Sequence, residues 1–206
     1  SGQFNNRSFE SKILHKYLIK DRRSAFSMGI KIYKSDNYSR QGAGSADNDA
    51  DFKFMDDIYM DYPNQSNFWF PNTNYALFSE NVIFLNKNWS ITPGARIEYI
   101  RTRSEGYYEN LVYDNAGNVI FRESLTDSLD LSRGFALFGV GISHRVSSKS
   151  EFYANLSQNY RSVTFSDIRT ANPSFIIDPN ISDERGFTAD MGIRKEKPRL
   201  LFDINV

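Results

Sequence analysis

Segments in which apolar and polar side chains alternate strictly dominate the sequence and constrain its fold more than any other feature. In residues 25–34 every second side chain is apolar: Phe26, Met28, Ile30 and Ile32. Successive side chains of a strand point to opposite faces, so this pattern indicates a strand with one apolar and one polar face. We predict eight strands of this kind, although Leu14 and Leu18 break the alternation in the first: Phe9–Ile19, Ala25–Lys34, Tyr75–Leu85, Trp89–Arg101, Phe135–Val146, Glu151–Tyr160, Gly186–Arg194 and Arg199–Val206.

The connections between these strands alternate between short and long. Short polar turns close four hairpins: Lys20–Arg23, Asn86–Asn88, Ser147–Lys149 and Lys195–Pro198. Long segments join the hairpins: Ser35–Thr73, Thr102–Leu131 and the stretch that follows Tyr160. Outer-membrane barrels have short turns on one side and long loops on the other. The sequence therefore predicts an all-β, antiparallel transmembrane barrel, although a soluble β-sandwich also alternates its faces.

Three local expectations follow from the pattern. The long segment Thr102–Leu131 should carry a small hairpin of its own with its turn at Asp114–Gly117. Pro93 should mark a bulge or a strand end, because proline lacks a ladder donor. Aromatic side chains near strand ends are typical of the girdles that flank a membrane; the candidates are Tyr17, Trp89, Tyr99, Tyr160 and Phe187.

Composition excludes several functional classes. The 206 residues include 25 basic and 25 acidic side chains, so no basic face for nucleic acid is expected. Cysteine is absent, which excludes disulfides and thiolate metal sites. The two histidines, His15 and His144, lie far apart, and the acidic run Asp47–Asp51 lacks the glycine and glutamate of a calcium loop. We expect no enzyme activity, no resident metal and no cofactor.

Two stretches resemble a known family. The first is NYALFSENVIFLNKNWSITPGARIEYI, residues 74–100. The second is YANLSQNYRSVTFSDI followed by DPNISDERGFTADMGIR, within residues 153–194. Both resemble the barrel of TonB-dependent outer-membrane receptors of the ferric-dicitrate or siderophore type. The resemblance implies a 22-strand barrel with an N-terminal plug, so we expect residues 1–206 to be one middle-to-late segment of the barrel, about eight strands, without the plug.

The resemblance also implies a function. The expected protein is a transporter in the bacterial outer membrane that takes up ferric citrate or another ferric siderophore. TonB–ExbB–ExbD would drive it through the plug, and outer-membrane lipid would surround it. Arginine suits oxygen-rich anionic chelates, and the candidates near the long loops are Arg40, Arg101, Arg103, Arg161 and Arg169. Each could instead pair with a neighbouring carboxylate.

Two other functions remain open on the sequence alone. One is a self-contained small outer-membrane barrel with a structural or adhesion role. The other is a soluble β-sandwich binding module. Within the transporter hypothesis, the sequence does not choose among iron chelates, cobalamin, haem, glycans or other metals.

Overall fold

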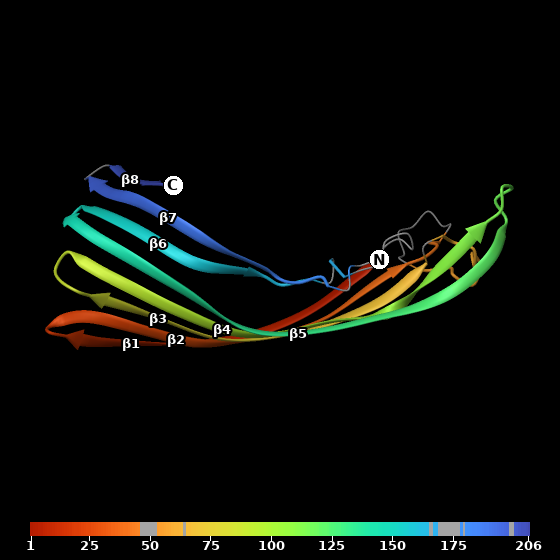
Figure 1. Cartoon of the computed structure of the whole chain (residues 1–206), viewed down its shortest axis with the longest axis horizontal. Coiled ribbons are helices and arrows are strands. Elements are labelled where there is room, and N and C mark those ends of the chain that lie inside the picture. The colour runs from red at the N-terminus through yellow and green to blue at the C-terminus, as the bar shows by residue number, and fades with distance from the viewer. Residues whose placement is uncertain (46–52, 64, 165–166, 169–177, 179, 198–199) are drawn as a thin grey trace.

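The computed structural model describes residues 1–45, 53–63, 65–164, 167–168, 178, 180–197 and 200–206. Eight strands form one antiparallel sheet in which the spatial order equals the order in the chain (Figure 1). The strands are β1 Gly2–Ile19, β2 Arg22–Gln41, β3 Ser66–Phe84, β4 Trp89–Tyr113, β5 Val119–Ser147, β6 Ser150–Arg161, β7 Glu184–Lys197 and β8 Leu200–Asn205. The prediction of an all-β antiparallel fold is therefore confirmed.

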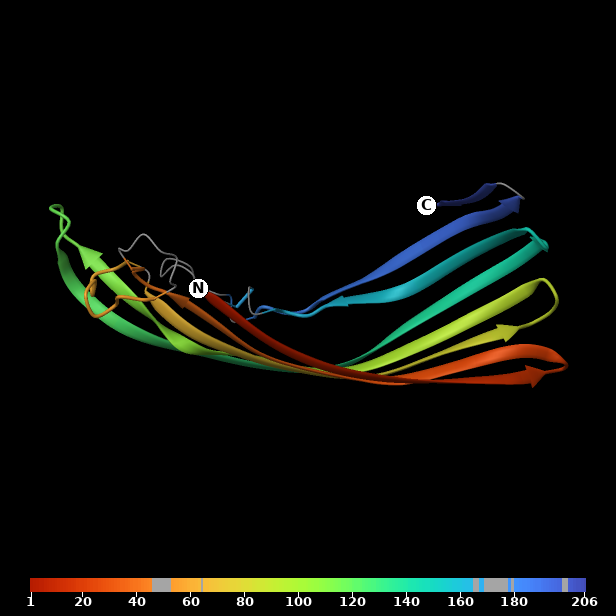
Figure 2. The ribbon, with the colours of Figure 1, turned by 180° about the vertical axis from the view of Figure 1, so that it is seen from behind.

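The sheet is a long, strongly curved ribbon (Figures 1 and 2). Strand pairing is continuous from β1 to β8, and no second sheet packs on it within the described residues. A β-sandwich needs two sheets whose apolar faces cover each other, so the arrangement opposes the soluble-sandwich alternative. Described residues of β1 and β8 do not pair with each other, so the sheet is an open segment and not a closed small barrel.

The two faces of the sheet differ in chemistry. We call the side of Phe26, Met28, Ile30 and Ile32, together with their cross-strand partners, the apolar face. Along β4 this face carries Ile91, Ile97 and Tyr99 at alternate positions. The opposite side, which we call the polar face, carries Lys31 of β2 and Arg96 and Glu98 of β4.

Burial is inverted relative to a water-soluble domain. On the apolar face, Ile13 is 67% exposed and Phe138 60% exposed. On the polar face, Ser35 is 2% exposed and Thr102 only 1%. A water-soluble sheet would bury the first pair and expose the second. A lipid environment requires this inverted arrangement, because it solvates apolar side chains and leaves polar groups to pair within the protein.

Short turns and long connections lie at opposite ends of the sheet. Lys20 and Asp21 form the first turn with φ of 47° and 64°, the left-handed values that a two-residue hairpin turn of type I′ needs. At the other end, the Asp114 carboxylate accepts hydrogen bonds from the backbone N–H groups of Ala116 and Asn118, at 2.9 and 2.8 Å. Gly117 closes this turn at φ 86°. The turn predicted at Asp114–Gly117 is confirmed.

β1 to β7 extend beyond their predicted bounds, whereas β8, predicted as Arg199–Val206, is Leu200–Asn205. Residues 102–113 and 119–131, expected to form a long loop with a separate hairpin, are continuations of β4 and β5. Their register runs on from Thr102↔Leu131 to Val112↔Phe121. The β4–β5 hairpin therefore projects past the other strands (Figure 1). The connection between β2 and β3 shrinks to residues 42–65 for the same reason.

Pro93 lies inside β4 and marks neither a bulge nor a strand end. The pairing of Pro93 with Val140 of β5 is in register with its neighbours. On the β3 side the register is also the same before and after Pro93, from Gly94↔Glu80 to Ile91↔Ile83. The β3 pairing is interrupted at Thr92 and Pro93 and resumes in the same register, so the proline weakens the ladder locally without shifting it.

The predicted girdle residues have different environments. The Trp89 ring packs at a tilt on His144 at 4.3 Å between ring centroids, and Tyr17 stacks on His15 at 6.0 Å, both at the short-turn end. Tyr99, in the interior of β4, stacks on Tyr75 at 6.5 Å. Phe187 is 71% exposed on the apolar face. Tyr160 is the exception, because its ring packs at 3.6 Å on Phe135, a polar-face residue.

Candidate functional site

Arg133 is the centre of an enclosed charged cluster on the described part of the polar face. Its Nε lies 3.1 Å from Oδ2 of Asp183, and the two side chains are only 14% and 12% exposed. Nη2 of Arg133 donates to Thr102 Oγ1 at 3.0 Å and to the carbonyl oxygen of Val163 at 3.4 Å. The ion pair with Asp183 offsets part of the cost of enclosing the arginine charge, although Nε itself makes no hydrogen bond within the described residues. The cluster therefore joins β4 and β5 to both ends of the β6–β7 connection, at Val163 and at Asp183.

The segment that follows β6 is held against the polar face. Val163 is 4% exposed and Ile168 is 1% exposed. The backbone N–H of Val163 donates to Asp183 Oδ1 at 2.8 Å. These contacts place the described part of the β6–β7 connection over the polar face at the long-loop end, on the concave side of the sheet (Figure 2).

Asp167 organises this segment. Its carboxylate accepts hydrogen bonds from the backbone N–H and the hydroxyl of Thr164, both at 2.8 Å, and from Arg161 at 2.9 Å. The backbone N–H of Thr164 is the main cause that lowers the pKa of Asp167 below its usual 3.8, followed by the Thr164 hydroxyl and Arg161. Each of these donors favours the ionised carboxylate.

The lowered pKa of Asp167 predicts how this segment responds to acid. Its hydrogen bonds stabilise the segment at all pH values above 3.8 and are lost as the pH falls through the lowered pKa. Hydrogen exchange at the Thr164 amide, corrected for intrinsic rate, should therefore remain slow down to below 3.8 and then accelerate. Asp167→Asn should exchange faster at neutral pH and lack this acid transition. Identical pH profiles for both proteins would contradict the role of Asp167.

Other charges on the polar face are paired in the same manner. Glu98 accepts from Asn74 Nδ2 at 2.9 Å and also bonds Arg96. The Phe78 ring lies between two cations, with Lys12 Nζ at 5.2 Å and Arg96 Cζ at 5.7 Å from its centroid. Paired charges and hydrogen-bonded amides are typical of a polar barrel interior.

The arginines predicted to contact substrate fall on different surfaces. Arg161 lies at the end of β6, 54% exposed, between Asp167 and Glu184, each at 2.9 Å. Arg40, Arg101 and Arg103 occupy apolar-face positions, because they align with Ile32 of β2 and with Tyr99 of β4 at even spacing. Arg169 lies outside the described residues, as does the acidic run Asp47–Asp51.

The three apolar-face arginines already have partners. Arg40 pairs with Asp56 of the β2–β3 connection. Arg101 forms a bidentate pair with Asp130, at 3.0 and 2.5 Å. Arg103 lies 5.8 Å above the ring of Trp69. Substrate contact by the predicted arginines stays a prediction, and these placements weigh against it for the three.

Sequence reasoning missed Arg133, although a signal was present. The alternation in Phe135–Val146 puts Phe135 on the polar face, and one further step of two residues reaches Arg133. The predicted strand begins at Phe135, so Arg133 lies outside it. The partner Asp183, fifty positions along the chain, carries no comparable signal in the sequence.

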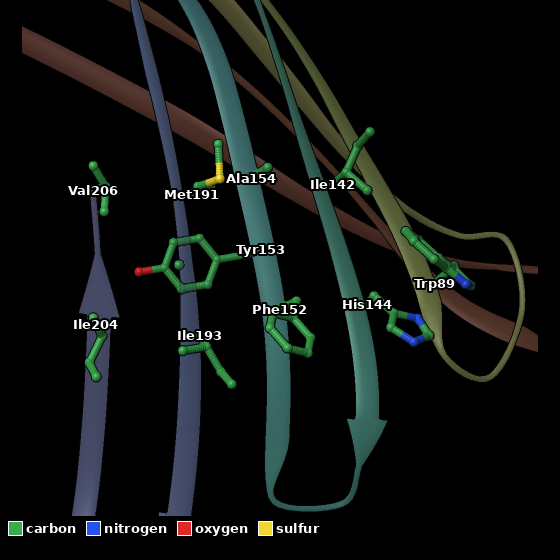
Figure 3. Close-up of a pocket in the computed structure, with 11 residues that line it drawn as sticks. Trp89, Ile142, His144, Phe152, Tyr153, Ala154, Met191, Ile193, Ile204 and Val206 are labelled. Carbon is green, nitrogen blue, oxygen red and sulfur yellow. The ribbon is translucent and has the colours of Figure 1, made fainter.

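An open apolar groove of about 450 Å³ lies at the short-turn end (Figure 3). Its lining includes Trp89, His144, Phe152, Met191 and Ile204. These residues belong to the apolar face, so the groove is separate from the Arg133 cluster. His144 packs on Trp89, and no group of three metal-ligating side chains occurs among the described residues.

The fold and the polar-face cluster define a class of protein: a membrane-spanning antiparallel sheet with an apolar outside, a paired-charge interior and long loops at one end. Among the described residues there is no helix long and apolar enough to cross a membrane. A family model described as TonB dependent receptor-like, beta-barrel, matches residues 2–206. The chain belongs to this family.

Family membership confirms three expectations. Its members lie in the bacterial outer membrane, and they are receptors for transport and not enzymes. The expected kinship with TonB-dependent receptors is confirmed as well. In a barrel of this family the polar face is the interior and the apolar face is the outside.

Solved structures of low identity share the fold. The ferric yersiniabactin uptake receptor FyuA from Yersinia pestis matches with a TM-score of 0.67 and 12% identity, covering 99% of this chain and 28% of that one. The ferric-catecholate import receptor Fiu from K12 E. coli matches with a TM-score of 0.70 and 9% identity. The match covers 96% of this chain and 30% of that one. The ferric citrate transporter FecA in its unliganded form matches with a TM-score of 0.60 and 14% identity. The match covers 99% of this chain and 27% of that one.

The chain therefore spans less than a third of the length of these structures. No sequence among the curated proteins matches it.

Proposed function

We propose that this chain is part of an outer-membrane receptor that imports a ferric chelate, with energy from TonB–ExbB–ExbD delivered through a plug domain inside a barrel of about 22 strands. The supporting observation is that two arginines lie beside the segment held over the barrel interior at the long-loop end. Arg161, at the end of β6, begins this segment, and Arg133 of β5 contacts it. Three solved relatives of the same fold carry ferric-chelate names.

The chemistry of this region suits an anionic, oxygen-rich ligand. Arg161 is half exposed and has carboxylates on both sides, so a chelate carboxylate or catecholate could replace Glu184, which is 69% exposed. Planar guanidinium groups form paired, charge-assisted hydrogen bonds with such oxygens. We infer that Arg161 is the first interior arginine an incoming chelate meets, with Arg133 beneath Val163. Ferric citrate and other siderophores share the required chemistry.

Uptake by the complete receptor tests the proposal. Cells that depend on this receptor, starved of iron, should accumulate radioactive iron from at least one of ferric citrate, a ferric catecholate or a ferric phenolate chelate. Accumulation should saturate and should disappear when tonB is deleted. Transport of cobalamin or haem without any ferric chelate would overturn the substrate class, and uptake that persists without tonB would overturn the mechanism.

The arginine assignment has its own test. Arg161→Gln should raise the half-saturating chelate concentration about tenfold, because a charged hydrogen bond to the ligand is lost. The matched control is Arg145→Gln, an exposed arginine at the opposite end of the interior, paired in register with Glu151. If the two variants take up iron with the same half-saturation, Arg161 is not a ligand contact.

A further inference from the structure

Strand β5 has a long free edge at the long-loop end of the sheet. It pairs with β4 along most of its length, but with β6 only from Gly139 to Ser147. Beyond Gly139, β5 runs on past the end of β6 (Figure 1). Among the described residues, no other segment makes a backbone hydrogen bond to residues 124–132 on this side. We call residues 124–132 the β5 edge.

The β5 edge lies on the aqueous side of an aromatic level. Tyr99 stacks on Tyr75 at 6.5 Å and pairs in register with Gly134 of β5. Amphipathic rings of this kind mark the level at which hydrocarbon gives way to headgroups. Residues 124–132 follow Gly134 in the direction of the β4–β5 turn, so water and not lipid surrounds the β5 edge.

The free groups of the β5 edge are the backbone N–H and C=O of its even-numbered residues. Phe138 donates its N–H to Oε1 of Gln158 in β6 at 2.9 Å, so its backbone groups point away from β4. Backbone direction alternates along a strand, and the register with β4 is unbroken from Phe138 to Phe121. The residues that direct a donor and an acceptor to the free edge are therefore Ser124, Thr126, Ser128, Asp130 and Ser132. An extended polypeptide matches such a row of donors and acceptors.

Nothing on the outward side of the β5 edge blocks the addition of a strand. Prolines, lysines and bulges protect exposed edges, and residues 124–132 contain none of them. Asp130 carries the one outward charge of this range, and its carboxylate is paired with Arg101. The other outward side chains are serine and threonine, which are small enough to leave the edge open.

The inward side of the β5 edge selects the chemistry of a partner. Asp127 lies between Leu125 and Leu129 on the polar face and pairs in register with Gly106, which has no side chain. The Asp127 carboxylate has no ion pair or hydrogen bond within the described part of the chain. A strand added to the free edge places one side chain directly beside each of these three residues. The complementary order is apolar, basic, apolar at alternate positions.

We propose that the β5 edge binds an extended segment of a partner protein, whose alternate side chains are apolar, basic and apolar. Charge complementarity favours this occupant over a second copy of the chain. Two β5 edges paired about their centres would place one Asp127 directly opposite the other, and like charges in that position are destabilising. The partner approaches from outside the membrane, and its binding does not depend on which ligand the receptor transports.

The test uses the complete receptor that contains this chain, purified in detergent, and the peptide Thr-Leu-Thr-Lys-Thr-Leu-Thr as a probe. The probe presents the same order of side chains in either strand direction. Residue-resolved hydrogen exchange should be fast at Thr126 and Ser128 and slow at the odd-numbered residues between them and beside them, which bond β4. Saturating probe should slow the even-numbered amides by about tenfold or more, because strand pairing protects them.

Two results of the exchange experiment would overturn the proposal. Slow exchange of the even-numbered amides without the probe would mean that another part of the receptor, or a second copy, already covers the β5 edge. Unchanged fast exchange with saturating probe would mean that the edge does not accept a strand of this chemistry.

Ser128→Pro tests the backbone pairing. It removes one free N–H and places a ring on the edge, but it removes no bond to β4. Affinity for the probe should fall by about tenfold or more. The matched control is Ser128→Ala, which keeps the N–H and should bind the probe as the unchanged receptor does. Equal affinity of both variants would overturn the backbone pairing.

Asp127→Lys tests the charge and remains informative if Ser128→Pro fails to fold. This variant should bind the lysine probe about fivefold more weakly than the unchanged receptor does. It should instead prefer a probe with glutamate in place of lysine, because the opposite charges then face each other. Damage to the strand cannot reverse a preference in this way. The same ranking of the two probes by both receptors would overturn the proposed chemistry of the partner.

Discussion

Replacing Arg133 with methionine should release the β6–β7 connection from the barrel interior. The substitution leaves the Asp183 side chain, which is 12% exposed, without its cation. Breaking a buried ion pair by removing one partner destabilises by about 3–5 kcal/mol. The expected result is fast hydrogen exchange at Val163 and Thr164, and loss of most chelate uptake by the complete receptor. Exchange measured by mass spectrometry and iron uptake in the same cells check both parts.

Two further variants separate the ion pair from simple damage to the strand. Arg145→Met removes an exposed polar-face arginine from the same strand, so it should leave exchange at Val163 unchanged. The double variant Arg133→Met, Asp183→Leu removes both charges and should recover most of the protection, because no unpaired carboxylate remains. If the double variant exchanges as fast as Arg133→Met alone, the unpaired charge is not the cause.

The membrane-facing part of the fold was predictable because a strand with one face toward lipid needs an apolar side chain at every second position. Every second residue of Phe26–Ile32 must be apolar, and the alternation follows strand by strand. Outside the lipid this rule stops. In residues 102–113 and 119–131 both faces carry polar side chains, so no contrast reveals a strand. The pairing of these residues depends on the register inherited from the membrane-facing part, and that register is visible only in the folded sheet.

The candidate site also has one part that the sequence could predict and one part that it could not. Residue type alone selected five arginines, but their function depends on which face the register gives them. Arg101 is an even number of positions from Ile97 and Tyr99, so the alternation itself predicts that it leaves the interior. Arg133 gains its importance from Asp183 and Val163, which the fold brings from a distant part of the chain. Contacts of that kind have no local sequence signal.

Substituting valine for Gly106 should separate β3 from β4 at the long-loop end. A Cβ at this position would meet the Asn67 carbonyl oxygen and would lie 2.6 Å from Phe68 Cδ1 and 2.7 Å from Phe68 Cα. Because two of these atoms are backbone, a rotamer change cannot relieve the contact. Phe68 is also 1% exposed and stacks on Phe70 at 5.9 Å, so it has no free volume to enter. Overpacking costs about 1–3 kcal/mol when side chains can adjust, and more is expected here.

The predicted loss of protection from hydrogen exchange is confined to one region, so it can be measured against the rest of the sheet. Exchange should accelerate at residues 66–69 and 105–108, which pair across the clash, while β6 and β7 stay protected. The control is Gly134→Val on the adjacent strand, where the nearest atom to an added Cβ is the Glu98 carbonyl oxygen at 3.9 Å, an ordinary contact. Hydrogen exchange in the Gly134→Val variant should match that of the protein without a substitution. Equal protection of residues 66–70 in both variants would mean that β3 and β4 approach less closely at Gly106 than the geometry indicates, and that Phe68 can move aside.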